Sequence, residues 1–158
     1  MAGKQHVFLV PGFFGFLNLG ELTYFSRVCE QLALRLDQLG VPADVRAVGT
    51  LPTASLRSRA AQLAEAVQLH APGEGPVHFV GHSSGGLDCR LLVTPTVSLP
   101  TDVDADAIGR RTRSVVTIAT PHYGTPLASF ATGVLGQKLL RTLSIVTLYA
   151  LRIGKRPL

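Results

Sequence analysis

The sequence predicts an α/β protein with a mostly parallel sheet and helices on both of its faces. Apolar segments of strand length alternate along the chain with longer segments whose apolar residues recur at helical spacing. This alternation favours parallel strands, because each helix returns the chain to the starting end of the sheet. In addition, the apolar segment 77–80 runs into Gly81-His82-Ser83-Ser84-Gly85 and then into a helical pattern, which predicts a sharp strand-to-helix turn.

The first half of the chain predicts two strands, each followed by a helix. Residues 7–10 form a continuous apolar run that is typical of a buried strand. Residues 25–39 carry apolar side chains at helical spacing, and Gly40 supplies a C-terminal cap. Residues 44–48 predict a short second strand, and residues 55–70 predict a second helix with one apolar face.

The second half predicts two further strands around one helix. The strand at 77–80 leads into the turn and a short helix that starts at Ser84. Residues 94–111 are polar and rich in Asp and Pro, so we expect an exposed excursion there. Residues 114–119 are rich in β-branched side chains and predict the last strand of this part of the sheet.

Composition excludes some classes of function. The chain has 158 residues, is 46% hydrophobic and only 16% charged, where about 25% charged is usual. Its net charge of +5 comes mostly from scattered arginines, which favours a solvated basic surface and not a nucleic-acid-binding face. Contact with an anionic membrane surface or another lipid–water interface stays open. Cys29 and Cys89 are expected to be free thiols, and no Cys/His spacing suggests a metal site.

The turn at residues 81–85 has the G-x-S-x-G pattern of a nucleophile elbow. In such a turn the central residue, here Ser83, is lifted above the end of the sheet. The glycines on either side allow the strand and the helix to approach closely. The helix that begins at Ser84 directs its first amides toward the reaction site, where they favour negative charge. Ser83 is therefore the candidate nucleophile, and the alternative is an ordinary glycine-rich turn with an incidental serine.

The segment after the first strand supports the same site. Pro11 and Gly12 follow the strand and lead into an aromatic group of Phe13, Phe14 and Phe16. A loop at this place supplies one amide of an oxyanion hole, and the residue after the nucleophile supplies the other. We therefore expect the Phe13 and Ser84 N–H groups to be the oxyanion donors, with the three phenylalanines walling an apolar acyl pocket. The alternative for each phenylalanine is a plain core position.

These segments resemble, in order, those of the bacterial triacylglycerol lipases and related esterases of the α/β-hydrolase superfamily. The resemblance covers residues 6–130 and includes the block Thr120-Pro121-His122-Tyr123-Gly124-Thr125-Pro126, which is more specific than the elbow alone. Pro11-Gly12 stands where the family usually has His-Gly, and Ser84 where it often has Gln. Both changes keep the backbone amides of the oxyanion hole.

The resemblance implies an α/β-hydrolase fold and a serine hydrolase of carboxylic esters that forms an acyl-enzyme on Ser83. His122 would line the substrate site. The family's triad acid and histidine follow two further strands, so we expect residues 1–132 to be the N-terminal part of the core, with the C-terminal strands missing. Residues 133–158 contain an apolar run flanked by basic residues and would begin a helical lid or cap, and the alternative is a core helix that lacks its packing partners.

Several alternatives remain at this stage. An amidase, thioesterase or acyltransferase can use the same fold, and a catalytically inactive fragment or binding protein is the non-enzymatic reading. A compact triad of Ser83, one of the acids Asp102, Asp104 or Asp106, and His122 is formally ordered correctly. The expected partner is an acyl ester or lipid substrate, with no cofactor. No signal peptide is recognised, which leaves a cytoplasmic location by default. The sequence indicates no oligomeric state.

Overall fold

The computed structural model describes residues 3–12, 21–51, 54–73 and 75–125. The chain divides into two compact units, residues 1–120 and 121–158, each described by itself. The first unit contains, in chain order, β1 (Gln5–Val10), α1 (Glu21–Gln38), β2 (Ala43–Ala47), α2 (Leu56–His70), β3 (Val77–His82), α3 (Gly85–Leu92), α4 (Ala105–Arg111) and β4 (Thr112–Ile118). In the described part of the second unit, the Gly124 N–H donates to the Pro121 carbonyl oxygen at 3.0 Å.

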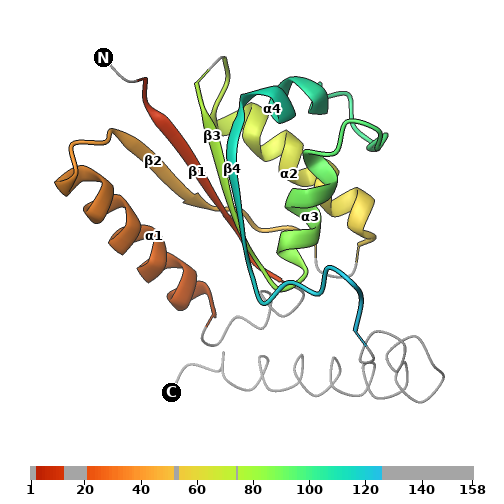
Figure 1. Cartoon of the computed structure of the whole chain (residues 1–158), viewed down its shortest axis with the longest axis horizontal. Coiled ribbons are helices and arrows are strands. Elements are labelled where there is room, and N and C mark those ends of the chain that lie inside the picture. Colours follow the sequence, from red (N-terminus) through yellow and green to blue (C-terminus); the bar gives the residue numbers. More distant parts are fainter. Residues whose placement is uncertain (1–2, 13–20, 52–53, 74, 126–158) are drawn as a thin grey trace, which may run out of the picture. The chain divides into compact units, whose positions relative to one another are not determined.

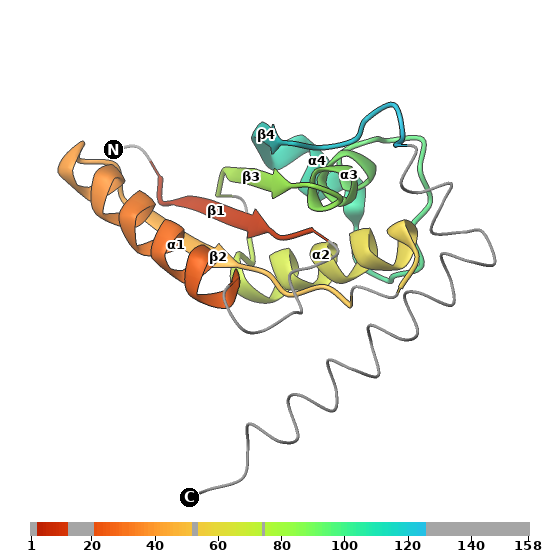
Figure 2. The same ribbon diagram turned by 90° about the horizontal axis from the view of Figure 1, so that it is seen from below.

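The four strands form one parallel sheet in the order β2-β1-β3-β4 (Figure 1 and Figure 2). β1 lies between β2 and β3, with Phe8 opposite Arg46 of β2 and Phe79 of β3. β4 pairs with β3, and a register irregularity lies between Val77 and His78. The predicted mostly parallel α/β fold is therefore confirmed. All four carboxyl ends lie at the same edge of the sheet, because parallel strands run in one direction.

Helices cover both faces of this sheet, as the strand sequences require. Alternate residues of a strand point to opposite faces, so Phe8 and Val10 pack on one side while Val7 and Leu9 pack on the other. Phe8 and Val10 belong to a core cluster built with α2, α3 and α4, and Val7 and Leu9 to a cluster built with α1. Figure 1 shows α1 on one side of the sheet and the other three helices opposite it.

The ends of α1 and α2 have clear chemical causes. Gly40 follows α1 with a φ of +69°, a left-handed conformation in which glycine carries no Cβ penalty. The Gly40 N–H bonds the Asp37 carbonyl and the Val41 N–H bonds the Leu36 carbonyl, both at 2.9 Å. At the start of α2, Ser55 Oγ accepts from the Ser58 N–H at 3.2 Å. The predicted starts and ends of these helices therefore agree with the structure to within a few residues.

One expectation about the second half is wrong in part. The predicted excursion at 94–111 contains α4, which begins with Asp104 accepting the Ala107 N–H at 2.8 Å and is anchored by the buried side chain of Ile108. β4 is an edge strand in the described part of the chain and is not covered on both faces. Val116 and Ile118 are each 50% exposed, although their residue types predict burial.

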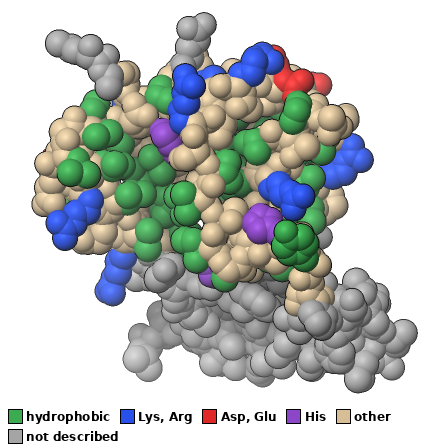
Figure 3. All heavy atoms as spheres, in the orientation of Figure 1, with side chains coloured by type: hydrophobic (Ala, Val, Ile, Leu, Met, Phe, Trp, Pro, Cys, Tyr) green, Lys and Arg blue, Asp and Glu red, His purple; other side chains and the backbone are tan. Residues whose placement is uncertain are grey.

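The exposed apolar side chains of β4 lie on the same face of the sheet as α1. Val116 and Ile118 are in register with Val80 and His82, so all four side chains lie on the α1 side of the sheet. Figure 3 shows hydrophobic side chains gathered on the face of the molecule that carries α1 and β4. No helix among the described residues has both the length and the apolar character needed to cross a membrane.

Candidate active site

The turn between β3 and α3 has the backbone of a nucleophile elbow. β3 ends at His82 and α3 begins at Gly85, so only Ser83 and Ser84 connect strand to helix. Ser83 has a φ of +54°, a left-handed conformation that costs a residue with a Cβ about 1–2 kcal/mol. The Ser83 N–H donates to the Ile118 carbonyl at 2.9 Å, which ties the turn to the end of β4. Strain of this kind persists where neighbouring structure enforces it, and it clusters at functional sites.

The packing around this turn is so close that three of its positions have no room for a side chain and must be glycine. A Cβ on Gly81 would lie 2.5 Å from Gly86 Cα, so β3 and α3 touch through bare backbone. A Cβ on Gly85 would collide with the carbonyl oxygens of Val10 and Pro11, and one on Gly86 with the side chain of Thr120. Real Cβ atoms do not make contacts this short, and backbone cannot yield as a flexible side chain can. The elbow therefore depends on glycine at all three positions.

The segment after β1 lies directly against the candidate nucleophile. A Cβ on Gly12 would lie 2.6 Å from Ser83 Cβ and 3.0 Å from Ser83 Oγ. This close approach is where an oxyanion loop has to lie relative to a nucleophilic serine. The next residues, Phe13, Phe14 and Phe16, lie outside the described residues. The expected oxyanion role of Phe13 and the expected pocket roles of Phe14 and Phe16 therefore stay predictions.

Ser84 follows Ser83 at the start of α3, and its expected role as an oxyanion donor stays a prediction. It forms the N-cap of α3 with φ −63° and ψ −19°, and its side chain makes no capping bond. Among the described residues, the Ser84 N–H has no hydrogen-bond acceptor. The positive end of α3 lies at this residue, because the first amides of a helix lack intrahelical partners. The Ser84 amide can therefore donate to a negatively charged oxygen near Ser83.

Neither His78 nor His82 of the first unit is placed to activate Ser83. The ring of His82 lies 6.3 Å from that of Phe25, on the α1 side of the sheet. His78 bonds Ser114 Oγ at 2.8 Å and Gln5 Oε1 at 2.9 Å, nearer the amino end of the sheet. His122 belongs to the second unit, and its expected place in the substrate site stays a prediction.

Two acids of the compact-triad alternative, Asp104 and Asp106, are badly placed. Asp104 caps α4 and Asp106 lies in its first turn, and α4 directly precedes β4. These acids therefore lie at the amino end of β4, whereas Ser83 lies at the carboxyl end of the neighbouring parallel strand. A seven-residue strand such as β4 spans about 20 Å. A carboxylate that far away cannot orient a histidine that is hydrogen-bonded to Ser83.

A buried ion pair beneath the elbow is the main feature that sequence reasoning missed. Arg59 was expected among solvated surface arginines, but its side chain is 3% exposed and pairs with Asp88, which is 0% exposed, at 2.6 Å. Arg59 Nη2 also donates to Ser84 Oγ at 3.1 Å. A signal for this burial was present, because Arg59, Leu63 and Val67 recur every four residues and so share one face of α2.

Burial raises the pKa of Asp88 to about 6, although the charge and hydrogen bond of Arg59 oppose the shift. The folded protein therefore binds a proton on Asp88 before the unfolded chain does as the pH falls. Where the folded state binds more protons than the unfolded chain, the free energy of unfolding rises as the pH falls. Lowering the pH from 7 to 5 should therefore raise the free energy of unfolding by about 1 kcal/mol through Asp88.

The measurement is denaturant unfolding at both pH values for the wild type and for Asp88→Asn, which cannot titrate at this position. The wild type should gain stability relative to the Asn variant on acidification. A relative loss would mean a lowered pKa and would contradict this prediction.

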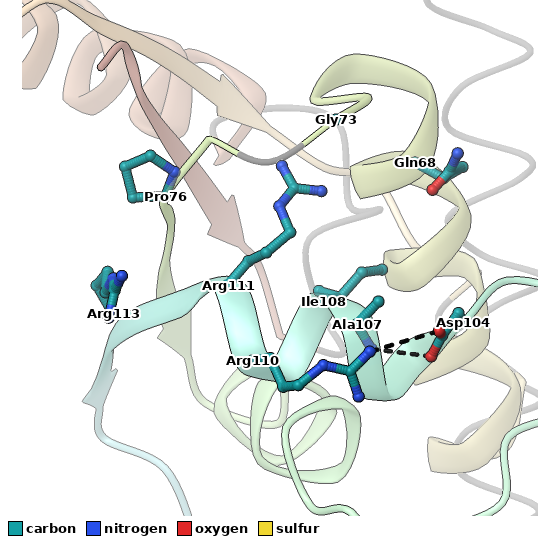
Figure 4. A pocket seen from close by; sticks show the side chains of 9 residues that line it. All are labelled: Gln68, Gly73, Pro76, Asp104, Ala107, Ile108, Arg110, Arg111 and Arg113. Carbon is teal, nitrogen blue, oxygen red and sulfur yellow. Dashed lines mark hydrogen bonds and ion pairs between the residues drawn. The ribbon is translucent and has the colours of Figure 1, made fainter.

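A cavity of about 480 Å³ lies elsewhere, between the α2–β3 connection and α4 (Figure 4). Its lining includes Arg110, Arg111 and Arg113, but these side chains point in different directions (Figure 4). Arg111 donates to the carbonyls of Ala71 and Gly75, and Arg110 lies 3.7 Å from Asp104. The cavity opens near the amino ends of β3 and β4, away from Ser83, so we assign it no part in catalysis. Among the described residues, no cluster of His, Cys, Asp and Glu could hold a metal ion.

Comparison with known proteins gives little beyond this geometry. No protein-family model matches the chain, and no curated protein matches it at a significant level. Among solved structures, an iodinated complex of acetyl xylan esterase at 1.80 Å aligns with 16% sequence identity and a TM-score of 0.49. The alignment covers 78% of this chain and 66% of the esterase chain, so this chain spans just under two thirds of that neighbour's length. Evidence for a function must therefore come from this chain's own residues.

Proposed function

We propose that this protein is a serine hydrolase of carboxylic esters, of the lipase or esterase type, which forms an acyl-enzyme on Ser83. The observation that carries the proposal is the left-handed backbone of Ser83 at a strand-to-helix turn, with Gly12 packed against its side chain. Such a turn exposes a serine hydroxyl beside free helix amides, which is the arrangement that acyl transfer requires. Strained backbone of this kind clusters at functional sites, which supports a role for Ser83 over an incidental serine.

In the proposed reaction, Ser83 Oγ attacks the acyl carbonyl carbon and its proton passes to a histidine. The carbonyl oxygen becomes an oxyanion that accepts from the amides of Phe13 and Ser84. Collapse of this intermediate breaks the ester bond, and the leaving alcohol takes the proton from the histidine. Water then attacks the acyl-enzyme with the same histidine as base, which releases the acid and restores Ser83. The apolar acyl chain would lie against Phe14 and Phe16, with His122 lining the site.

The histidine and the acid that activate Ser83 are proposed to come from outside residues 1–158, because residues 121–158 contain no acid and His122 is not proposed as the base. The placement of His78 and His82 supports this, because their rings face other partners. Residues 133–158, proposed as the start of a lid over the 1–132 core, lie outside the described residues. Their sequence supports the proposal, because an apolar run at 142–151 is flanked by Lys and Arg. A lid of that composition would suit work at a lipid–water interface.

The direct test is labelling of the complete enzyme, which also carries the proposed histidine and acid, with a fluorophosphonate, followed by mapping of the modified peptide by mass spectrometry. The probe should modify Ser83, and the neighbouring Ser84 should stay unmodified. A His122→Ala variant should be labelled at the same position, since the base is proposed to be another histidine. A panel of p-nitrophenyl esters, anilides and thioesters should show preference for esters. Modification at a different serine, or none at all, would contradict the proposal, and a preference for anilides or thioesters would favour an amidase or thioesterase.

A further inference from the structure

One guanidinium holds both ends of the first turn of α3. Arg59 Nη2 lies 2.6 Å from Asp88 Oδ2 and 3.1 Å from Ser84 Oγ. Ser84 and Asp88 are one helical turn apart, and the Asp88 N–H bonds the Ser84 carbonyl at 3.3 Å. Arg59 itself is carried by α2, which packs on α3 in the same core cluster. The side chain therefore connects a rigid neighbouring helix to the residue that directly follows Ser83.

Burying Arg59 and Asp88 in the core contributes little to the free energy of unfolding. A buried ion pair contributes little net stability, because taking both charges out of water costs about as much as their attraction returns. In addition, Arg59 Nε and Asp88 Oδ1 are buried without a hydrogen-bond partner among the described residues, and unsatisfied buried polar atoms are destabilising. Two apolar side chains would fill the same space without either cost. This comparison favours a role in geometry over a role in stability.

Building on the proposed function, we propose that Arg59 is a positioning residue of the nucleophile elbow. Its bond to Ser84 Oγ fixes the orientation of Ser84, and with it the direction of the Ser84 amide beside Ser83. An oxyanion donor stabilises the transition state only when it is already aimed at the developing charge. Ser83 is strained, so the turn needs an external restraint to hold that aim. Arg59 is 3% exposed and acts through Ser84 without touching the substrate.

The test separates positioning from simple stabilisation by removing both charges together. Arg59→Met alone should lower the unfolding midpoint strongly, because it leaves Asp88 buried and unpaired. Arg59→Met combined with Asp88→Leu should restore the midpoint. Even so, the combined variant should react with the fluorophosphonate about tenfold or more slowly at Ser83, since small misplacements of a catalytic group have large effects. Its backbone amide NMR signals at Ser83–Gly85 should shift, while those of core residues such as Phe79 should not.

Two further variants complete the design. Ser84→Ala removes the acceptor and should slow labelling by a similar factor, and adding it to the combined variant should cause no further loss, as expected for residues acting through one contact. Arg57→Met is the matched control, because Arg57 lies two residues earlier on α2 and donates to the Ser98 carbonyl at the surface. This control should leave both the labelling rate and the elbow signals unchanged.

The outcomes distinguish this inference from the proposed function. If the combined variant is as stable as the wild type, is labelled at the wild-type rate and keeps the elbow signals, the positioning role is overturned. If the wild type is not labelled at Ser83, the proposed function fails. The NMR signals alone then test whether Arg59 positions the turn. Shifts confined to the elbow in both the combined variant and Ser84→Ala would support the positioning of this turn by Arg59, and unchanged signals would overturn it.

Discussion

In the complete enzyme, replacing Ser83 with alanine should lower ester hydrolysis by at least about 10³-fold, because the members of a catalytic triad act as a unit. The fold should survive, since the alanine retains the Cβ and the backbone bond to Ile118. Replacing Ser83 with glycine should be equally inactivating, yet it should raise the unfolding free energy by up to about 1 kcal/mol. The gain is expected because glycine adopts a φ of +54° without the steric cost that serine pays.

The measurements are initial rates with p-nitrophenyl esters and denaturant unfolding of the same preparations. Ser114→Ala is the control, because Ser114 is an exposed hydroxyl on β4 whose partner, His78, lies away from the elbow. Hydrolysis that continues in the Ser83→Ala variant would assign the reaction to another group. A Ser83→Gly variant less stable than the wild type would mean that the turn is not strained.

Replacing Gly85 with alanine should have the largest effect on folding. Its Cβ would collide with the backbone oxygens of Val10 and Pro11, so β1 and α3 would have to separate. Overpacking against backbone should cost about 3 kcal/mol or more, a large part of the 5–15 kcal/mol typical of a folded domain.

Gly109 provides a matched control on α4. It is also a helical glycine, but the nearest atoms to its Cβ position would be 3.9 Å away, on Val93. Gly109→Ala should therefore raise the unfolding free energy by about 0.5–1 kcal/mol, because alanine is the better helix former. Denaturant midpoints of both variants check the pair. Equal effects of the two substitutions would contradict the close packing at the elbow.

The sequence predicted those parts of the fold that are encoded by local pattern. The apolar run that became β1, the glycine that ends α1 and the glycines around Ser83 each act on their own neighbourhood, so a single segment carries the signal. The parallel sheet followed from the alternation of these segments. The left-handed backbone of Ser83 is the conformation that the strand–turn–helix pattern implies.

What the sequence did not reveal depends on contacts between distant segments. α4 has seven residues and one buried apolar side chain, Ile108, which is too little for a periodic pattern. The exposure of β4 depends on which strand lies at the edge, and an apolar run looks the same at an edge as in the centre. The burial of Arg59 depends on its meeting Asp88, a residue 29 positions later. A charged residue on an apolar face indicates such a partner without identifying it.

The glycine contacts around the elbow also bear on how this protein could be altered by directed evolution. At positions 12, 81, 85 and 86 any side chain would overlap backbone, the nucleophile or the side chain of Thr120, so these sites tolerate almost no sequence variation. Random mutagenesis spread over the whole chain would spend many variants on positions that only glycine can occupy. A library that keeps these four glycines constant and varies the segment after Gly12 would concentrate diversity where substrate preference is proposed to be decided. The same steric rule predicts that homologues which keep the elbow will keep these four glycines even where the rest of the sheet has diverged.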